Sequence, residues 1–260
     1  MKRKYITEAG FDKRYKRIED FSKYPDDTIW DDEGAEEKER QEIGSSETSI
    51  NNRNLPYTFA NGRGISWDKG GYNLDIGGGK FDNGTEHLMN EYGVINLIFD
   101  PFNRNSDFNS KTLDKVEEIG GADTVTVNSC LNVIKGRKFI ESVIMQAAES
   151  LKPDGVAFFK IYAGNKSGLP IKTTKGYQQN KRASKYIPLI HTYFNDIWID
   201  NGNDVIVAKK PIVNAENKVK WYPDPNGDAR YLNLRREFID RVTKNVIKEE
   251  IRRIIYRKKA

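Results

Sequence analysis

The chain has 260 residues, a net charge of +5, and charged and hydrophobic fractions of 31% and 37%. The hydrophobic fraction is below the roughly 45–50% (a value that also counts Gly) of an average globular protein, which predicts one core-forming domain with polar segments outside it. No apolar run approaches the roughly 20 residues that cross a bilayer, and the N-terminus lacks the apolar stretch of a secretory signal. We therefore expect a cytoplasmic protein without a membrane partner.

The distribution of charged, polar and apolar residues along the chain predicts three parts. Residues 1–50 form a polar, partly acidic N-terminal extension, in which Trp30 is the expected anchor. Residues 51–210 form the folded domain, and residues 211–260 form a linker and a basic amphipathic helix. The basic side of this helix would attract phosphate backbones. Its apolar side would dock on the domain or on a second subunit to form an oligomer.

From residue 72 onward, strand-like and helix-like stretches alternate. They are expected as strand 72–77, helix 85–92, strand 94–99, helix 110–119, strand 123–128, helix 139–151, turn 152–155 and strand 156–162. A loop over 163–180 follows, and strands 193–200 and 204–209 are then joined by Asn201-Gly202-Asn203, a hairpin signal. This order predicts a Rossmann-like α/β fold, with a mostly parallel sheet, an antiparallel edge hairpin and helices on both faces.

The strongest motif is the glycine turn that follows the first of these strands, Asp75-Ile76-Gly77-Gly78-Gly79. A glycine turn between a strand and a helix is the context of a nucleotide-binding site, because glycines let a ligand approach the backbone. The next strand ends in Asp100, which would lie beside the first strand and accept both hydroxyls of a ribose. The sequence therefore predicts an adenosine-type ligand at the carboxyl ends of two adjacent strands.

Two common nucleotide motifs do not fit this turn. A P-loop requires Gly-Lys-Ser/Thr where the sequence has Gly79-Lys80-Phe81, and a dinucleotide fold requires a glycine where Asp82 stands. The acids that flank the turn, Asp75 and Asp82, disfavour a pyrophosphate and favour a cationic ligand. S-adenosylmethionine is such a ligand, since it carries a sulfonium and an ammonium group.

At this point the sequence resembles the class I S-adenosylmethionine-dependent methyltransferases. Residues 75–79 are similar to their first motif, Asp100 to their ribose-binding acid, residues 123–129 to their fourth-strand motif, and residues 151–156 to the turn before their fifth strand. Asp154 replaces a glycine in that last turn. Residues 100–104 and 130–134 also resemble a group of uncharacterised phage and bacterial methyltransferase-like proteins.

The resemblance covers about residues 70–210 and implies both the fold and S-adenosylmethionine as the cofactor. The cofactor-binding residues that it implies are Asp75, Gly77, Gly78, Gly79, Asp100, Pro101, Asn128 and Ser129. One feature departs from the family pattern. Between Asp100 and Asp123 there is room for one helix but not for a strand–helix unit, so the usual third strand and its adenine-contacting acid are missing or displaced.

Three acceptor chemistries are each matched in part. Adenine-N6 and cytosine-N4 enzymes have two prolines and an aromatic residue after the fourth strand, where this chain has Asn128-Ser129-Cys130-Leu131; Asn128 alone could accept from an amino group. Cytosine-C5 enzymes have a nucleophilic cysteine where Cys130 stands, but their accompanying motifs are absent, and we interpret Cys130 as a packing residue. Ribose 2′-O enzymes have a lysine where Lys160 stands, but their aspartate falls on Asn128.

The candidate catalytic residues are therefore Asn128 and Lys160. The loop after the Lys160 strand is expected to face the substrate through Tyr162, Lys166, Lys172 and Tyr177, and its lysines, including Lys181 with Arg182, suit an anionic substrate. No metal is expected, because the chain has one Cys and only two His, of which His191 is interpreted as structural.

The sequence thus predicts a methyltransferase acting on nucleic acid. A methyltransferase of a small molecule or protein, and a catalytically inert cofactor-binding partner or phage protein, are the alternatives.

Overall fold

The computed structural model describes residues 13–28, 30, 54–134, 136–173 and 176–212. The acidic run of the N-terminal extension and the basic C-terminal helix lie outside these residues, as does the oligomer contact expected of that helix. The division of the chain at residues 50 and 210 stays a prediction. Within the described residues, no helix is long and apolar enough to span a membrane.

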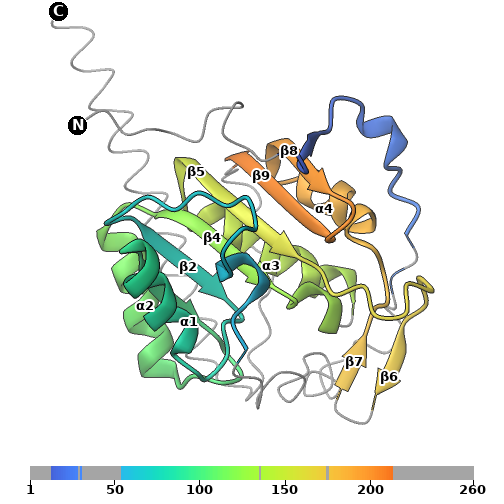
Figure 1. Cartoon of the computed structure of the whole chain (residues 1–260). Coiled ribbons are helices and arrows are strands. Elements are labelled where there is room, and N and C mark those ends of the chain that lie inside the picture. Colours follow the sequence, from blue (N-terminus) through green and yellow to red (C-terminus); the bar gives the residue numbers. More distant parts are fainter. Residues whose placement is uncertain (1–12, 29, 31–53, 135, 174–175, 213–260) are drawn as a thin grey trace, which may run out of the picture.

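A seven-stranded sheet forms the centre of the fold (Figure 1). Its strands lie in the order β1-β8-β9-β5-β4-β2-β3, with β3, β2, β4 and β5 parallel to one another and β9 antiparallel to β5. The strands are β1 (Lys16–Arg17), β2 (Tyr72–Ile76), β3 (Ile95–Phe99), β4 (Ala122–Asn128), β5 (Leu151–Lys160), β8 (Phe194–Asp200) and β9 (Val205–Pro211). The predicted Rossmann-like sheet with an antiparallel edge hairpin is confirmed.

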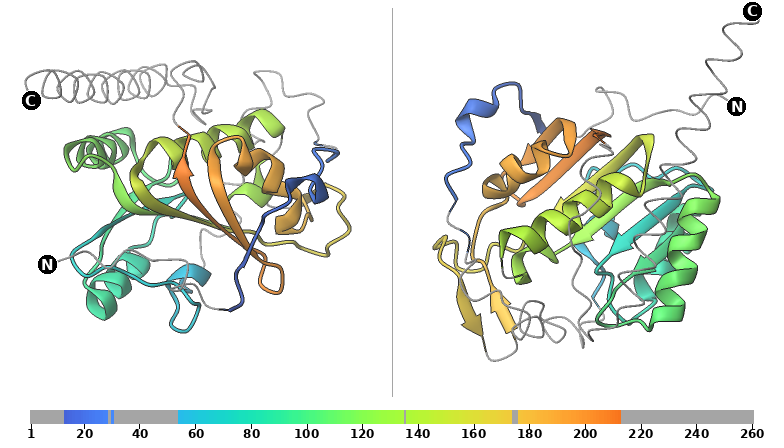
Figure 2. Two further views of the ribbon diagram at one scale, coloured as in Figure 1. Left: turned by 90° about the horizontal axis from the view of Figure 1, so that it is seen from above. Right: turned by 180° about the vertical axis from the view of Figure 1, so that it is seen from behind.

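Helices cover both faces of this sheet (Figure 2). One face carries α2 (Ser106–Glu118), α3 (Arg137–Glu149) and α4 (Ile187–His191), and the other carries α1 (Asn83–His87), its π-helical continuation η5 (Leu88–Tyr92) and the short helix η4 (Tyr57–Phe59). Side chains alternate between the faces along each strand. In β2, Leu74 therefore packs in the main apolar core, whereas Asn73 and Asp75 point to the opposite face of the sheet and bond there to other polar side chains.

The strand β3 forms one edge of the sheet in the described part of the chain. Between Phe99 and Ala122 the chain forms only α2, and β4 then pairs with β2 on the side opposite β3. As the spacing from Asp100 to Asp123 predicts, one helix and no strand lies between β3 and β4. The carboxyl end of β3 is consequently bordered by the loop that enters α2, rather than by another strand.

Two segments differ from the sequence prediction. The strand β5 begins at Leu151 and contains the expected 152–155 turn as a bulge, because Ala122 pairs with Leu151 but Thr124 pairs with Val156. The chain approaches itself so closely there that a side chain on Gly155 would lie 2.7 Å from Leu151. The predicted loop over 163–180 contains a small hairpin of β6 (Ile171–Thr173) and β7 (Gly176–Gln178).

Part of the N-terminal extension packs on the far edge of the sheet. Strand β1 pairs antiparallel with β8, and Arg17 forms an ion pair of 3.1 Å with Asp196. Phe21 stacks on His191 with ring centroids 3.6 Å apart, which agrees with a structural role for this histidine. Trp30, the expected anchor, is buried with 7% exposure.

Candidate functional site

A cavity of about 270 Å³ opens at the carboxyl ends of β2, β3 and β4. Its walls come from the glycine turn, the loop after β3, the end of β4 and the segment around η4. The eight residues that the sequence assigned to the cofactor all line it: Asp75, Gly77, Gly78, Gly79, Asp100, Pro101, Asn128 and Ser129. The fold thus brings together residues from three separate segments of the sequence, 75–79, 100–101 and 128–129.

Backbone conformation and crowding both favour glycine in the turn. Gly77 and Gly79 have φ angles of 75° and 76°, in the left-handed region that favours glycine. A Cβ on Gly78 would lie 2.6 Å from a carboxylate oxygen of Asp75, and one on Gly77 would lie 3.0 Å from the sulfur of Cys130. The turn therefore presents bare backbone to the cavity.

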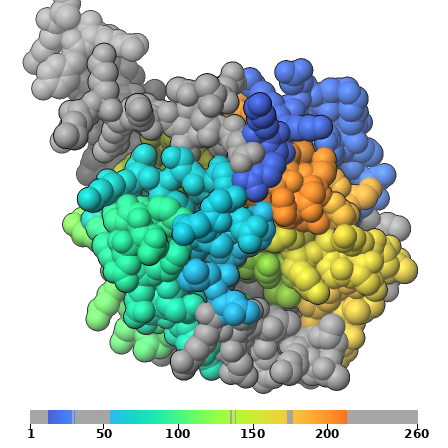
Figure 3. Space-filling model, viewed as in Figure 1, coloured from blue at the N-terminus to red at the C-terminus, as the bar shows by residue number. Residues whose placement is uncertain are grey.

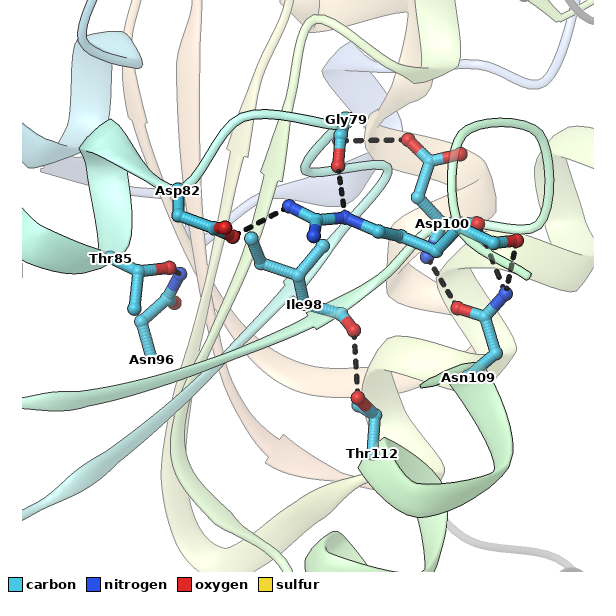
Figure 4. A network of polar contacts seen from close by, with 9 residues as sticks. Gly79, Asp82, Thr85, Asn96, Ile98, Asp100, Asn109 and Thr112 are labelled. Carbon is cyan, nitrogen blue, oxygen red and sulfur yellow. Dashed lines mark hydrogen bonds and ion pairs between the residues drawn. The ribbon is translucent and has the colours of Figure 1, made fainter. Parts of the chain in front are cut away.

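Asp100 organises the turn from the end of β3 (Figure 4). Its Oδ2 accepts from the Gly79 amide at 2.8 Å, and its Oδ1 accepts from the amides of Phe102 and Asn103 at 2.9 Å. The backbone of Asp100 is in turn bonded to the side chain of Asn109, which donates to its carbonyl and accepts from its amide. The carboxylate is thereby held in one orientation at the cavity wall.

A further donor to Asp100 was not foreseen from the sequence. The side-chain amide of Asn103 donates to both carboxylate oxygens, at 3.2 and 3.1 Å. A carboxylate has about four acceptor sites, and the three backbone amides use three of them. The fourth acceptor site is on Oδ2, and a ligand can reach it when the Asn103 amide does not occupy it. With the three backbone amides in place, we expect Asp100 to accept from one ribose hydroxyl rather than from two.

Arg104 connects the glycine turn to an acid beside it. Its Nε donates to the Gly79 carbonyl at 2.9 Å, and its guanidinium forms an ion pair of 2.7 Å with Asp82. This pairing neutralises Asp82, which does not line the cavity. The expectation that both Asp75 and Asp82 attract a cation is corrected accordingly, since of these two acids Asp75 alone lines the cavity.

Asp75 lies below the turn and is 1% exposed. Its Oδ1 accepts from the Thr126 hydroxyl at 2.8 Å and from the Asn128 amide at 3.3 Å. Burial raises its pKa to about 7 because desolvation penalises the carboxylate, these hydrogen bonds oppose that rise, and the charge of Asp100 adds to it. A cationic ligand in the cavity would favour the ionised form.

A ladder of buried polar side chains connects Asp75 to the rest of the sheet. Asn73 bonds to Asn96, Thr124 and Thr126, and Asn96 bonds to Thr85 of α1. This ladder was not predicted from the sequence. Polar residues at every second position of β2 and β4 would have indicated it, because such residues point to the same face of the sheet. Fully bonded buried networks fix their members in place, and this one fixes the base of the cavity.

Asn128 is held on both sides at the end of β4. Its amide donates to Asp75, and its carbonyl accepts from the Thr58 hydroxyl at 2.8 Å. Thr58 lies on η4 and is fully buried. It was not predicted from the sequence as a site residue. Ser129 follows with a φ of 52°, and such strained backbone is concentrated at functional sites. One lone pair of the Asn128 carbonyl stays available to a substrate donor.

Lys160 lies beside Asn128 in the strand register but is not among the residues that line the cavity. Its ammonium donates to the Asn203 carbonyl and lies 5.0 Å from the ring centre of Tyr57, a cavity residue. Burial lowers its pKa, and Asp204 partly opposes this. Asp204 itself is bonded to the Ala183 amide and paired with Arg182. The catalytic role expected of Lys160 stays a prediction.

Cys130 is held in its thiol form. Burial, with Asp100 and Asp75 nearby, raises its pKa to about 12. A nucleophilic cysteine requires the thiolate, so this environment agrees with a packing residue.

We expect native Cys130 to react with iodoacetamide at mildly alkaline pH far more slowly than in the denatured chain, in which its pKa returns to about 8.5. Mass spectrometry of the alkylated peptide over time measures both rates. Equal rates in the two states would contradict a protected thiol and would add Cys130 to the catalytic candidates.

The four residues expected to face the substrate lie on the loop after β5 but do not line the cavity. Tyr162, Lys166 and Lys172 are exposed, whereas Tyr177 is buried with 6% exposure. Lys181, counted with the basic loop, is buried and donates to Gln179. Arg182, counted with it too, is paired with Asp204. The cationic character of this loop therefore depends on fewer residues than expected.

Sheet order, glycine turn and cavity together define a Rossmann-like α/β protein with a ligand site at the carboxyl edge of its sheet. The chain matches no protein-family model, and no curated protein matches it significantly. Among solved structures it is similar to DesVI of Streptomyces venezuelae, with 12% identity and a TM-score of 0.34 over 54% of this chain and 83% of that one.

It is also similar to an S-adenosylmethionine-dependent methyltransferase from Clostridium acetobutylicum ATCC 824, with 14% identity and a TM-score of 0.34 over 53% of this chain and 82% of that one.

Proposed function

We propose that this chain is an S-adenosylmethionine-dependent methyltransferase. The observation that carries the proposal is the cavity at the carboxyl ends of β2, β3 and β4, in which a bare glycine turn lies between the two acids Asp75 and Asp100. Its volume of about 270 Å³ is near the lower end of the usual range of about 300–1,000 Å³ for ligand sites.

The residues of the cavity fit this cofactor better than they fit a dinucleotide. Asp75 is a buried acid whose pKa is raised to about 7. A cationic ligand would stabilise its ionised form, whereas a pyrophosphate would favour the protonated form and would gain no charge attraction from it. Asp100 would accept a ribose hydroxyl, and the turn would contact the ligand through its backbone. When bound, S-adenosylmethionine supplies an activated methyl group for transfer to a nucleophile.

We further propose nucleic acid as the acceptor. The support for this comes from the exposed lysines Lys166 and Lys172 on the loop after β5, which follows the strand beside the cavity. Asn128, whose carbonyl retains one lone pair at the cavity wall, is the candidate to receive an amino group of the substrate. Methylation of a small molecule or a protein is the second candidate.

Calorimetry with S-adenosylmethionine, S-adenosylhomocysteine and the dinucleotide NAD tests the cofactor. We expect the first two to bind and NAD not to bind, because Asp75 opposes a pyrophosphate. Binding of NAD at least as tight as that of S-adenosylmethionine would contradict the proposal.

Transfer of labelled methyl groups to DNA, RNA and cell extract then tests the acceptor. Label that nuclease releases supports nucleic acid, and label that only protease releases supports the second candidate. Cofactor binding without any transfer would indicate an inert cofactor-binding protein.

A further inference from the structure

We propose that the loop after β5 binds single-stranded nucleic acid through its exposed apolar and basic side chains. These side chains, called here the Tyr162 surface, are Tyr162, Lys166, Leu169, Ile171 and Lys172. That this nucleic acid is the methyl acceptor rests on the proposed function. Binding of nucleic acid does not depend on methyl transfer, so binding and transfer are tested separately.

The charge of the surrounding segment is of one sign. Between Asp154 and Asp196 the sequence contains seven Lys or Arg (residues 160, 166, 172, 175, 181, 182 and 185) and no Asp or Glu. Arg182 pairs with Asp204, and Lys185 pairs with Asp27 at 3.3 Å. Lys166 and Lys172 are exposed on the Tyr162 surface. Such a segment attracts a polyanion.

The apolar side chains of the surface distinguish single strands from other polyanions. Tyr162, Leu169 and Ile171 are 59%, 67% and 45% exposed, whereas Tyr186 and Tyr193 of the same part of the chain are almost completely buried. Exposed aromatic side chains beside cations are the usual platform for unpaired bases, which stack on them regardless of sequence. Bases in a duplex are already stacked on each other and do not offer their faces.

Side-chain amides fix the backbone that carries these residues. Asn132 accepts from the Tyr162 amide at 3.2 Å, and Gln178 donates to the Tyr162 carbonyl at 3.0 Å. Asn180 donates to the Leu169 carbonyl at 3.0 Å. The loop is thus preorganised, which reduces the ordering cost of binding.

The short helix η6 (Leu131–Val133) connects this surface to the cavity. Val133 lines the cavity, and its neighbour Asn132 bonds to Tyr162 and Gln178 of the loop and accepts from the Gln179 amide at 2.8 Å. The loop (yellow) and the segment around η4 (cyan) lie on the same face of the molecule (Figure 3). The loop that carries the Tyr162 surface is therefore joined to the cavity wall through η6.

Fluorescence anisotropy with labelled single-stranded RNA and DNA of mixed sequence, and with the matching duplexes, tests the proposal on the full chain. We expect single strands to bind more tightly than duplexes. Tyr162→Ala should weaken single-strand binding by about 5- to 150-fold, the effect of losing one base stack, and Tyr162→Phe should restore it. Lys166→Gln with Lys172→Gln should reduce the slope of log affinity against log salt by about 1.4.

Two matched variants control for the loss of any exposed apolar or basic side chain. Met89→Ala removes an exposed apolar side chain and Lys111→Gln an exposed charge, both outside the Tyr162 surface, and neither should change single-strand binding. Equal or tighter binding of duplexes, or unchanged binding by Tyr162→Ala, would overturn the inference and leave the surface to a protein partner. Calorimetry of the wild type with S-adenosylmethionine separates this failure from a failure of the proposed function.

Discussion

Asp100→Ala is expected to abolish measurable cofactor binding at ordinary ligand concentrations. The change removes a ribose acceptor and also the partner of three backbone amides, including that of Gly79, which shape the glycine turn. Each lost hydrogen bond to a charged group costs roughly 1.5–3 kcal/mol, so the ribose contact alone accounts for about a 10- to 150-fold loss of affinity. Calorimetry with S-adenosylmethionine measures the effect.

Asp82→Ala is the matched control, since it removes an acid from the same turn that is exposed and paired with Arg104. It should bind the cofactor within a few fold of the wild type. Asn103→Ala adds a second comparison, because it frees the oxygens of Asp100 while leaving the backbone donors in place, and should bind at least as tightly as the wild type. Unchanged affinity in Asp100→Ala would remove this acid from the site.

Asp75→Asn is expected to change stability and affinity in opposite directions. The pKa of Asp75 is about 7 in the folded protein against 3.8 ordinarily, so between these values the folded state holds a proton that the unfolded state has lost. The free energy of unfolding therefore falls as pH rises through this window, and the full penalty is present above about pH 7. Asparagine carries no charge and keeps the acceptor for Thr126, so the variant should melt at a higher temperature than the wild type at alkaline pH.

Cofactor affinity should show the reverse. In the wild type, binding of a cationic ligand should strengthen as pH rises through about 7, because the ligand favours the ionised carboxylate. Asp75→Asn should bind more weakly and without this pH dependence. Melting curves and calorimetry on either side of that pH measure both effects, with Asp82→Asn as the control for loss of an exposed acid. A wild-type affinity that is flat with pH would contradict an ionising acid in the site.

Local patterns in the sequence were enough to predict the order of elements. Alternating apolar strands and helices at 72–162 follow from side-chain periodicity, and the glycines at 77–79 permit a turn that few other residues adopt. Spacing alone also indicated the missing third strand, since 22 residues between Asp100 and Asp123 hold one helix and its turns. The parallel order of strands then places Asp75, Asp100 and Asn128 at one edge of the sheet.

The contacts that set the chemistry of this edge came only from the tertiary structure. Arg104 neutralises Asp82, Asn103 covers Asp100, and Thr58 bonds Asn128 from a segment 70 residues away. None of these pairings has a sequence signature, because each depends on which side chain a loop happens to bring within hydrogen-bond distance.

Among the effects of tertiary structure, burial changed the predicted properties of the charged residues most. From the sequence, Asp75 is an ordinary acid beside a turn, and the fold makes it a buried group with a pKa of about 7. The same holds for Lys181, which the sequence places in a basic loop and the fold buries against Trp30 and Gln179. Sequence determined where the charged residues lie along the chain, and packing determined their hydration, because the cost of desolvation depends on every atom that excludes water from a group.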